Sequence, residues 1–231
     1  MDWLRTLTDA GVRDVRGQLL TKGSYIQRPL PGAVKYVVAH YVGSAPIPGQ
    51  VGLAFCQATA RYHVTSRGWP GIGYHLAIDV LGDIYLVGGL DTIRANVANK
   101  NELVVGVCIQ GGGDGWVPSA MQRQAWYRLI PFVRQAVGNT LEIRGHRELQ
   151  ATQCPGNRYM EWLRPPVAAP PVATSYAVGP GNAAYIAAHP EQGAALGSSA
   201  FDANHNEYTE TANGFVIWSA KRKTCRGIIW G

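Results

Sequence analysis

Short apolar runs rich in β-branched and aromatic residues recur between residues 30 and 165, and glycine, proline or polar positions bound each of them. Runs of this kind and length are typical of buried strands. We therefore predict strands over residues 35–41, 74–80, 84–87, 103–109 and 140–144. Only Leu81-Gly82-Asp83 separates the second predicted strand from the third, so this pair should form a hairpin.

Two segments between these strands carry apolar residues at three- and four-residue spacing, which predicts helices. On the first, which ends near Gly68, the apolar face consists of Val51, Phe55, Ala58 and Tyr62. On the second, which Ser119 can cap, it consists of Met121, Ala125, Leu129, Phe132 and Ala136. A weaker helical pattern lies within residues 1–30. The alternation of strands and helices predicts an α/β domain with one mixed central β-sheet flanked by helices.

The composition changes after residue 165. Residues 166–180 are rich in proline and alanine, which favours a stiff, extended linker. Residues 181–231 are rich in glycine, asparagine and tyrosine and end in short apolar runs, which predicts a small strand-rich C-terminal module. We therefore expect a main domain over residues 1–165, with residues 1–30 as an N-terminal extension.

Composition and charge narrow the function only slightly. The chain has 231 residues, 46% of them hydrophobic and 16% charged, which is typical of a globular protein. Its net charge of +6 favours an anionic partner such as nucleic acid, a membrane surface or a phosphate-bearing cell wall. The same charge would also serve solubility alone, so charge does not choose among these.

The four cysteines are widely spaced and form no Cys-x-x-Cys pair, which argues against a disulfide framework. Cys56 and Cys108 lie in apolar runs and are expected to be buried thiols. The N-terminal residues lack the basic-then-apolar pattern of a signal peptide, and no stretch approaches the ~20 apolar residues of a membrane span. We therefore expect a chain made in the cytoplasm without a transmembrane segment.

Residues 143–156 carry the candidate chemistry. His146, Thr152 and Cys154 fall within nine residues, and a Pro-Gly turn follows the cysteine directly. Histidine and cysteine are preferred zinc ligands, and His40, at the end of a predicted strand, is the best candidate for a third. A lone histidine is more often a core or surface residue, but three such residues at element ends favour a metal site. Three protein ligands leave one position open, the arrangement of catalytic zinc.

Four sequence blocks in order resemble one known family. They are Tyr36-Val-Val-Ala-His40; Arg61-Tyr-His63 with Gly68-Trp69-Pro-Gly-Ile-Gly-Tyr74-His75; Asn101 with Gly106-Val-Cys108-Ile-Gln-Gly111; and Gly145-His146-Arg147-Glu148 with Cys154-Pro155-Gly156. Over about residues 15–165 the chain resembles the zinc-dependent N-acetylmuramoyl-L-alanine amidases (amidase type 2) of the phage-lysozyme and peptidoglycan-recognition-protein type. This resemblance implies a peptidoglycan-recognition-protein-like fold.

The resemblance also implies roles for individual residues. His40, His146 and Cys154 match the ligands of one Zn²⁺ per chain. Tyr74 matches the catalytic tyrosine, and Thr152 matches a position that helps to stabilise the oxyanion. The implied reaction is hydrolysis of the amide between N-acetylmuramic acid and L-alanine of the stem peptide. Zinc would activate water and polarise the carbonyl, and Tyr74 and Thr152 would donate hydrogen bonds to the oxyanion.

Further residues are candidates for supporting roles. Tyr41 and Trp69 are expected either to pack or to contact the substrate, and His63 to support the site from behind. His75 follows Tyr74 on a predicted strand, so its side chain should face the other way and be structural. Asn96 stands where many relatives have a histidine, and it is a candidate for substrate binding. Residues 106–109 hold no carboxylate, although a related amidase branch has a catalytic glutamate there, so the general base is unassigned.

Two other functions remain open from the sequence. A non-catalytic peptidoglycan-recognition protein would share the fold, but the presence of Cys154 argues against it. A basic nucleic-acid-binding protein with a structural zinc would need a closed set of four ligands. The C-terminal module faintly resembles repeats of cell-wall-associated proteins in Ala195-Leu-Gly197, Asn213-Gly214-Phe-Val-Ile-Trp218-Ser and Gly227-Ile-Ile, so it either binds the wall or packs as an appendage. We expect a monomeric, lytic enzyme that acts on peptidoglycan and anionic wall polymers. The domain layout favours a phage endolysin, and a bacterial autolysin exported by another route fits the chemistry equally.

Overall fold

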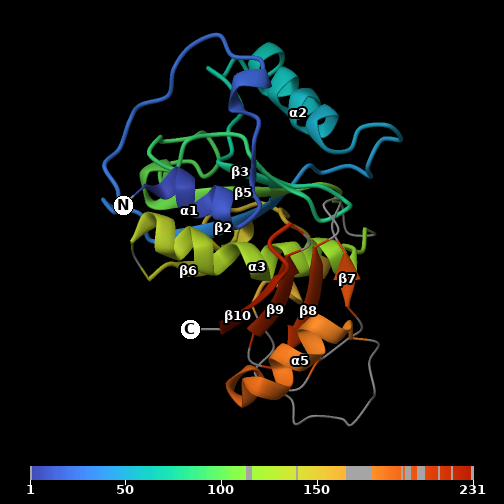
Figure 1. Cartoon of the computed structure of the whole chain (residues 1–231). Helices are drawn as coiled ribbons and strands as arrows, with labels where there is room; N and C mark the ends of the chain where they lie inside the picture. The colour runs from blue at the N-terminus through green and yellow to red at the C-terminus, as the bar shows by residue number, and fades with distance from the viewer. Residues whose placement is uncertain are drawn as a thin grey trace. The chain divides into compact units, whose positions relative to one another are not determined.

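The computed structural model describes residues 2–112, 116–138, 140–164, 178–193, 195, 199–201, 206–212, 214–219 and 221–229 (Figure 1). The chain divides into two compact units, residues 1–164 and 165–231. The predicted linker over residues 166–180 lies mostly outside the described residues. Part of the predicted wall-protein resemblance, at residues 196–197 and 213, lies outside them too.

The first unit is built on a six-stranded sheet with the strand order β1-β4-β3-β5-β2-β6. Its strands are β1 (Arg13–Asp14), β2 (Tyr36–Tyr41), β3 (Leu76–Ile78), β4 (Ile84–Leu86), β5 (Val104–Ile109) and β6 (Glu142–Gly145). All neighbouring pairs are parallel except the β3–β4 hairpin, which is antiparallel. The predicted mixed central sheet is therefore confirmed, with β3 and β5, both buried, at its centre.

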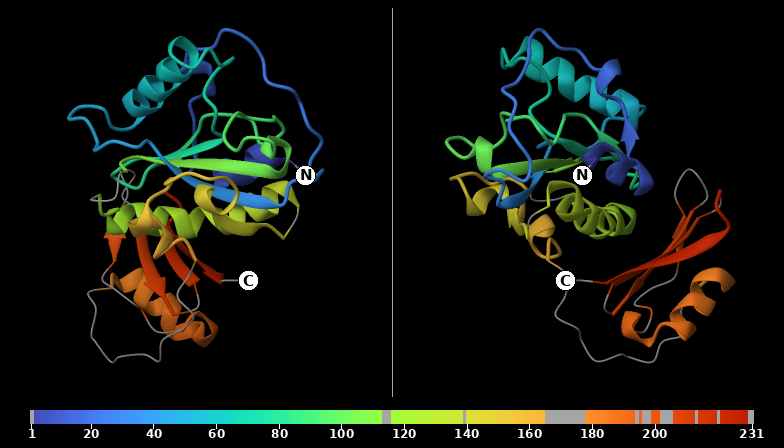
Figure 2. Two further views of the ribbon diagram at one scale, coloured as in Figure 1. Left: turned by 180° about the vertical axis from the view of Figure 1, so that it is seen from behind. Right: turned by 60° about the vertical axis from the view of Figure 1, so that its left-hand side comes forward.

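Helices cover both faces of this sheet. Figures 1 and 2 show α2 (Leu53–Thr65) on one side and α3 (Ala120–Val137) on the other. The N-terminal helix α1 (Trp3–Asp9) packs on α3. Shorter elements are η1 (Arg16–Gln18), η2 (Asn101–Leu103), η3 (His146–Glu148) and α4 (Asn157–Met160). In the described part of the chain, no helix combines the length and apolarity needed to cross a membrane.

Ser119 caps α3, as predicted. Its hydroxyl accepts a hydrogen bond from the Gln122 backbone nitrogen at 3.1 Å, and the Gln122 side chain accepts one from the Ser119 nitrogen. This reciprocal pair satisfies two of the amide groups that a helix start leaves open. The helix ends at Gly138, whose φ of 80° places it in the left-handed region that favours glycine.

The burial of α3 is wider than the predicted apolar face. Trp126 and Tyr127 are also fully buried, although they lie outside that face. The indole nitrogen of Trp126 donates to the Leu163 carbonyl at 2.8 Å, and the Tyr127 hydroxyl donates to the Trp162 carbonyl. The helix is therefore covered by the sheet on one side and by residues following α4 on the other, which helical periodicity alone did not predict.

The β3–β4 hairpin is tied together by Asp79. One of its carboxylate oxygens accepts hydrogen bonds from the backbone nitrogens of Leu81 and Asp83, at 2.9 and 3.0 Å. The predicted hairpin is confirmed, but β3 is shorter than predicted. Tyr74 and His75 precede the strand, so the tyrosine belongs to the loop that enters the sheet.

The second unit packs α5 (Pro180–Ala188) on a four-stranded antiparallel sheet of order β10-β9-β8-β7. The strands are β7 (Ala200–Phe201), β8 (Glu207–Thr211), β9 (Gly214–Ser219) and β10 (Thr224–Ile229), and η4 is Pro190–Gln192. The strand-rich prediction is confirmed, but the helix was not predicted, and it begins inside the expected linker. Asn182, fully buried on α5, donates to the Thr209 hydroxyl at 2.9 Å and to the Val216 carbonyl at 3.2 Å.

Candidate metal centre and cleft

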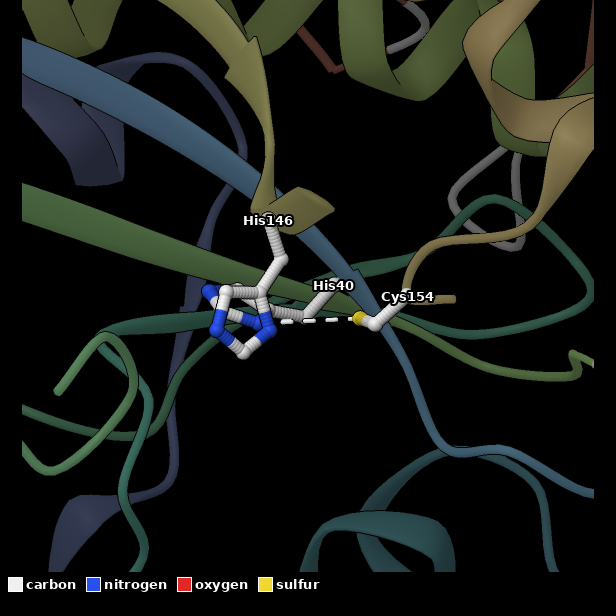
Figure 3. Close-up of side chains that lie close together, drawn as sticks. All are labelled: His40, His146 and Cys154. Atoms are coloured by element: carbon white, nitrogen blue, oxygen red, sulfur yellow. Dashed lines mark hydrogen bonds between the residues drawn. The ribbon is translucent and has the colours of Figure 1, made fainter. Parts of the chain in front are cut away.

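The two candidate histidine ligands lie at the ends of neighbouring strands. β2 and β6 run parallel, with Ala39 paired to Gly145. His40 follows on β2, and His146 begins η3 directly after β6. Because parallel strands end at the same edge of a sheet, the two imidazole rings meet with their centroids 4.5 Å apart. Figure 3 shows both side chains directed to the same point as Cys154.

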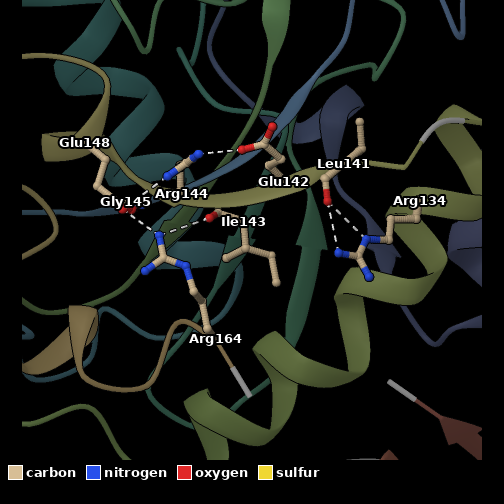
Figure 4. A network of polar contacts seen from close by, with 8 residues as sticks. All are labelled: Arg134, Leu141, Glu142, Ile143, Arg144, Gly145, Glu148 and Arg164. Atoms are coloured by element: carbon tan, nitrogen blue, oxygen red, sulfur yellow. Dashed lines mark hydrogen bonds and ion pairs between the residues drawn. The ribbon is translucent and has the colours of Figure 1, made fainter. Parts of the chain in front are cut away.

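A polar network holds the segment that carries His146. The Glu148 carboxylate accepts a hydrogen bond from the Gly145 nitrogen at 2.7 Å and pairs with Arg164. Arg164 also donates to the Ile143 carbonyl, which ties the end of the unit to β6 (Figure 4). Glu148 therefore fixes the start of η3, and with it the position of the His146 backbone.

Cys154 reaches the two histidines because its loop folds back. The Arg147 nitrogen donates to the Cys154 carbonyl at 2.8 Å, and the Thr152 hydroxyl accepts from the Cys154 nitrogen at 3.2 Å. The Tyr41 nitrogen points at the Cys154 sulfur at 3.4 Å. Sγ of Cys154 then lies 3.8 Å from Nδ1 of His40. One ligand atom from each of the three residues lies within 4.8 Å of the others.

This set of donors fits a zinc ion. Tetrahedral zinc holds sulfur at about 2.3 Å and nitrogen at about 2.0–2.1 Å, which places two ligand atoms about 3.6 Å apart. The observed separation between Cys154 Sγ and His40 Nδ1 is 3.8 Å. Two imidazoles and one thiol at these distances suit a single ion and leave one coordination position for another ligand.

Burial sets the protonation of the three side chains. It lowers the pKa of His40 well below its ordinary value, and it lowers the pKa of His146 as well. Both imidazoles are therefore neutral at pH 7, with a lone pair available. Burial also raises the pKa of the Cys154 thiol to about 12. The thiolate form thus needs a nearby cation, which a bound metal ion supplies.

A cleft of about 720 Å³ opens beside this cluster. Five of the residues singled out in the sequence line it: His63, Trp69, Tyr74, Asn96 and His146. Among the described residues along its walls, Arg67 is the one that carries a permanent charge. The cleft is therefore large enough for part of a glycopeptide.

Tyr74 stands between the cluster and the cleft. Its ring centroid lies 5.1 Å from that of His40 and 5.3 Å from that of His63. Burial raises the pKa of Tyr74 well above its ordinary value, with neighbouring cysteines acting in the same direction. The hydroxyl therefore stays protonated at neutral pH, and it can donate a hydrogen bond.

His63 lies behind Tyr74, away from the candidate ligands. Its Nδ1 accepts a hydrogen bond from the Gly73 nitrogen at 3.0 Å, and its ring lies 4.6 Å from that of Trp69. Burial lowers the pKa of His63 to about 4, so the ring is neutral. These contacts hold the loop that carries Tyr74.

Besides His40 and Cys154, two of the predicted site residues lie outside the cleft walls. Tyr41 packs its ring against Tyr159, with centroids 6.5 Å apart. Thr152 is exposed, and its hydroxyl oxygen is engaged with the Cys154 nitrogen. That contact uses a lone pair of the oxygen and not the hydroxyl proton, so Thr152 can still donate a hydrogen bond.

His75 has the structural position expected of it. It is fully buried, and its Nδ1 accepts a hydrogen bond from the Gly106 nitrogen at 3.0 Å. Nε2 must then carry the proton, and it faces the Thr92 carbonyl at 2.9 Å. These bonds join three loops and strands around the site without bringing His75 into the ligand cluster.

Sequence reasoning missed two polar neighbours of the ligands. Gln150 places its carbonyl oxygen 3.1 Å from Nε2 of His146. Asn96, predicted as a substrate contact, is 9% exposed, and its side chain counteracts the lowering effect of burial on the pKa of His40. For Gln150, the available sequence signal was its four-residue spacing from His146. Nothing in the sequence marked Asn96 as a neighbour of His40.

Sequence relatives of this chain include recognition proteins and an enzyme. Peptidoglycan-recognition protein SC1a of Drosophila melanogaster is 28% identical over 113 residues, 48% of this chain and 61% of the fly protein. Peptidoglycan recognition protein 1 of Bos taurus is 31% identical over 157 residues, 64% of this chain and 80% of the bovine protein. The N-acetylmuramoyl-L-alanine amidase of Sus scrofa is 27% identical over 150 residues, 62% of this chain and 25% of the porcine protein. The chain thus spans less than two thirds of the fly protein and a quarter of the porcine enzyme.

A solved structure shares the fold. Peptidoglycan recognition protein-LE, determined in complex with tracheal cytotoxin, superposes with a TM-score of 0.58 at 22% identity, over 65% of this chain and 91% of that protein. A family pattern described as N-acetylmuramoyl-L-alanine amidase matches residues 30–157, more than half of the chain. The resemblance read from the four sequence blocks is thereby confirmed for the family. This chain belongs to the N-acetylmuramoyl-L-alanine amidase family, which shares its fold with the peptidoglycan recognition proteins.

Proposed function

We propose that this protein is a zinc-dependent peptidoglycan hydrolase that cleaves the amide between N-acetylmuramic acid and L-alanine of the stem peptide. The observation that carries the proposal is the cluster of His40, His146 and Cys154 with Tyr74 beside it at the wall of a cleft. Family membership supports the same reaction, since one of the relatives is named for it.

The roles of the side chains follow from their protonation. His40 and His146 would hold the zinc ion through neutral imidazoles, and Cys154 through its thiolate. When bound, zinc supplies Lewis-acid activation of water and of the scissile carbonyl. Tyr74, protonated at neutral pH, would donate a hydrogen bond to the oxyanion that forms on that carbonyl. Thr152 is the second proposed donor, from the loop that carries Cys154.

The cleft offers no carboxylate for proton transfer. Among the described residues that line it, none is aspartate or glutamate. This agrees with the absence of an acidic residue in β5, where the sequence runs Gly106-Val-Cys-Ile109. We therefore propose the tyrosine-assisted form of the site rather than the form that uses a glutamate base.

A second candidate function is peptidoglycan binding without hydrolysis. The relatives named as recognition proteins favour it. The complete ligand set, Cys154 included, favours the enzyme instead. The thiolate would serve to hold the metal ion, whereas binding of glycan does not need it. A nucleic-acid-binding protein with structural zinc is the weaker alternative, since the described residues supply a cluster of three ligands and such sites use four.

For the second unit we propose binding to the bacterial cell wall. Lys221, Arg222, Lys223 and Arg226 are exposed on the β9–β10 hairpin and its strands. A cluster of this charge suits the phosphates of anionic wall polymers. With this unit attached, we propose that the protein acts as a monomeric lytic enzyme of the phage-endolysin kind. A chain ending at residue 164 should then bind purified walls less tightly, with the same products and the same turnover on soluble fragments.

The decisive experiment is product analysis on purified cell walls. Zinc-loaded protein should release new L-alanine amino termini and no new reducing sugars. Treatment with a chelator should abolish this release, and added zinc should restore it. New reducing ends would show a glycosidase and overturn the proposal. Binding to walls without any product would favour the recognition function.

A further inference from the structure

Residues 95–101, the loop before β5, lie beside both candidate histidine ligands. The loop owes its shape to Asn101, whose side-chain oxygen accepts hydrogen bonds from the backbone nitrogens of Asn96 and Val97 at 2.9 and 2.8 Å. In this loop, the Asn96 side chain and the Ala98 backbone nitrogen lie on the side of the metal cluster. These hydrogen bonds are made within the protein and define the conformation of the loop.

Gln150 fixes the protonation state of His146. Its side-chain oxygen accepts a hydrogen bond from the Ala98 nitrogen at 2.9 Å and lies 3.1 Å from Nε2 of His146. Because the amide of Ala98 can only donate, the atom of Gln150 facing it is the oxygen, which can only accept. Nε2 of His146 must therefore carry the proton. In a neutral ring this leaves the lone pair on Nδ1.

Asn96 is oriented just as firmly, by bonds on its nitrogen. Its Nδ2 donates to the Gly73 carbonyl at 3.2 Å and to the Arg94 carbonyl at 3.1 Å. Both amide hydrogens are thus used, and the oxygen Oδ1 is the atom that faces the other way. Oδ1 is buried and has no hydrogen-bond partner among the described residues.

The position of Gly106 shows where that oxygen lies. A methyl group on Gly106 would come within 2.6 Å of Oδ1 of Asn96. Gly106 pairs with Val38, and Cys108 pairs with His40, so Gly106 and His40 face the same side of the sheet. The buried Nε2 of His40 likewise has no hydrogen-bond partner in the described part of the chain, while Nδ1 of the same ring lies 3.8 Å from the Cys154 sulfur. Nε2 is therefore the His40 nitrogen that can donate a hydrogen bond to Asn96.

We propose that Asn96 and Gln150 are positioning residues, each accepting a hydrogen bond from Nε2 of one ligand histidine, so that both Nδ1 lone pairs point at a single metal ion. The proposal rests on the zinc site proposed above. Partners of this kind fix the tautomer and orientation of ligand histidines, and their loss costs metal affinity about 10- to 100-fold. Neither residue belongs to the three-ligand set itself.

Matched variants separate this role from a general effect of the loop. Gln150→Met and Asn96→Leu remove the acceptor at nearly constant size, whereas Gln150→Glu and Asn96→Asp keep it. Zinc affinity, measured in metal buffers with a competing chelator, should fall about 10- to 100-fold in the first pair and be retained in the second. Gln153→Met and Asn99→Asp alter exposed amides of the same loops and serve as controls, expected to match the unaltered protein. Equal affinity in all six variants would overturn the proposal.

The tautomers themselves can be measured without metal. Long-range nitrogen–proton NMR of the metal-free protein should show His40 and His146 protonated at Nε2. In Gln150→Met, His146 should become a mixture of tautomers while His40 stays unchanged. A ring protonated at Nδ1 in the unaltered protein would overturn the assignment. If the unaltered protein binds no zinc, the proposed function fails, but this measurement still tests the hydrogen bonds.

A third variant tests the role of Asn96 through a substitution on strand β5. Gly106→Ala would displace the Asn96 side chain, since the nearest atoms to the added methyl all belong to that residue. Zinc affinity should fall as in Asn96→Leu, and adding Gly106→Ala to Asn96→Leu should cost nothing more. Thermal unfolding of each metal-free variant shows whether it is folded. Additive losses in the double variant would contradict the proposal.

Discussion

The sulfur of Cys154 lies 3.8 Å from Nδ1 of His40, although 114 positions separate the two residues in the sequence. The contact exists because β6 lies next to β2, and because the loop after η3 folds back on Arg147. The two atoms already have about the separation of two ligands on one zinc ion. The fold therefore brings these two candidate ligands together from distant parts of the sequence.

Replacing Cys154 tests the ligand set directly. Cys154→Ala should reduce zinc affinity by roughly 100-fold or more, because the only anionic ligand is lost. Hydrolysis of cell walls should fall with zinc content. Cys225→Ala, in the second unit, is the matched control and should keep full zinc binding. Stoichiometric zinc in Cys154→Ala at micromolar free metal would show that the cysteine is not a ligand.

Zinc affinity should depend on pH through the thiol. The pKa of Cys154 is raised to about 12, so a proton must leave on binding, whereas the lowered pKa values of both histidines leave them neutral at pH 7. Affinity should therefore rise about tenfold per pH unit between pH 7 and 9 and fall as the pH is lowered. Calorimetry in buffers of different ionisation enthalpy should count about one proton released. A flat profile would contradict a thiolate ligand.

Tyr74→Phe should separate catalysis from metal binding. The variant removes only the hydroxyl, so zinc content should be unchanged, while kcat falls about 10²- to 10³-fold through loss of one oxyanion donor. Tyr62→Phe makes the same change on another cleft residue, one that is 48% exposed, and should leave kcat close to that of the unaltered enzyme. Equal kcat in the two variants would remove Tyr74 from the mechanism.

Thr152→Ala should lower turnover while zinc stays bound. We expect a loss of roughly 10-fold, smaller than for Tyr74, because Thr152 is exposed and hydrogen bonds are weaker near water. Thr152→Ser keeps the hydroxyl and should restore most of the rate. If zinc is lost as well, the role of Thr152 is to hold Cys154 through its 3.2 Å contact with the cysteine nitrogen.

Ser119→Ala should destabilise the first unit by about 1 kcal/mol, since it removes the N-cap of α3. The midpoint of thermal or denaturant unfolding should shift accordingly, with zinc affinity unchanged because the helix covers the face of the sheet away from α2. Ser66→Ala, at the C-terminal end of α2, makes the same substitution where no side-chain cap exists and should have little effect. An unchanged midpoint in Ser119→Ala would show that the capping box contributes nothing.

The sequence by itself determined most strands and the two long helices of the first unit, the family and the candidate ligands. Strands such as 35–41 were predictable because buried strands need β-branched and aromatic residues, and Ser119 because a helix start needs a side-chain acceptor. His40, His146 and Cys154 were predictable because few residue types bind zinc and because the blocks around them resemble one family. None of these inferences required knowledge of which strands are neighbours.

Only the tertiary structure decided how these residues meet. Strand order brought β2 beside β6, and register then placed His40 near His146. Asn96, expected as a substrate contact, lines the cleft and also lies near His40, and Gln150 lies beside His146, because loop conformation depends on contacts from distant segments such as Asn101 and Gly106. Hydrogen-bond direction and burial are properties of these surroundings, so residue identity could suggest candidate ligands but could not show which groups lie around them.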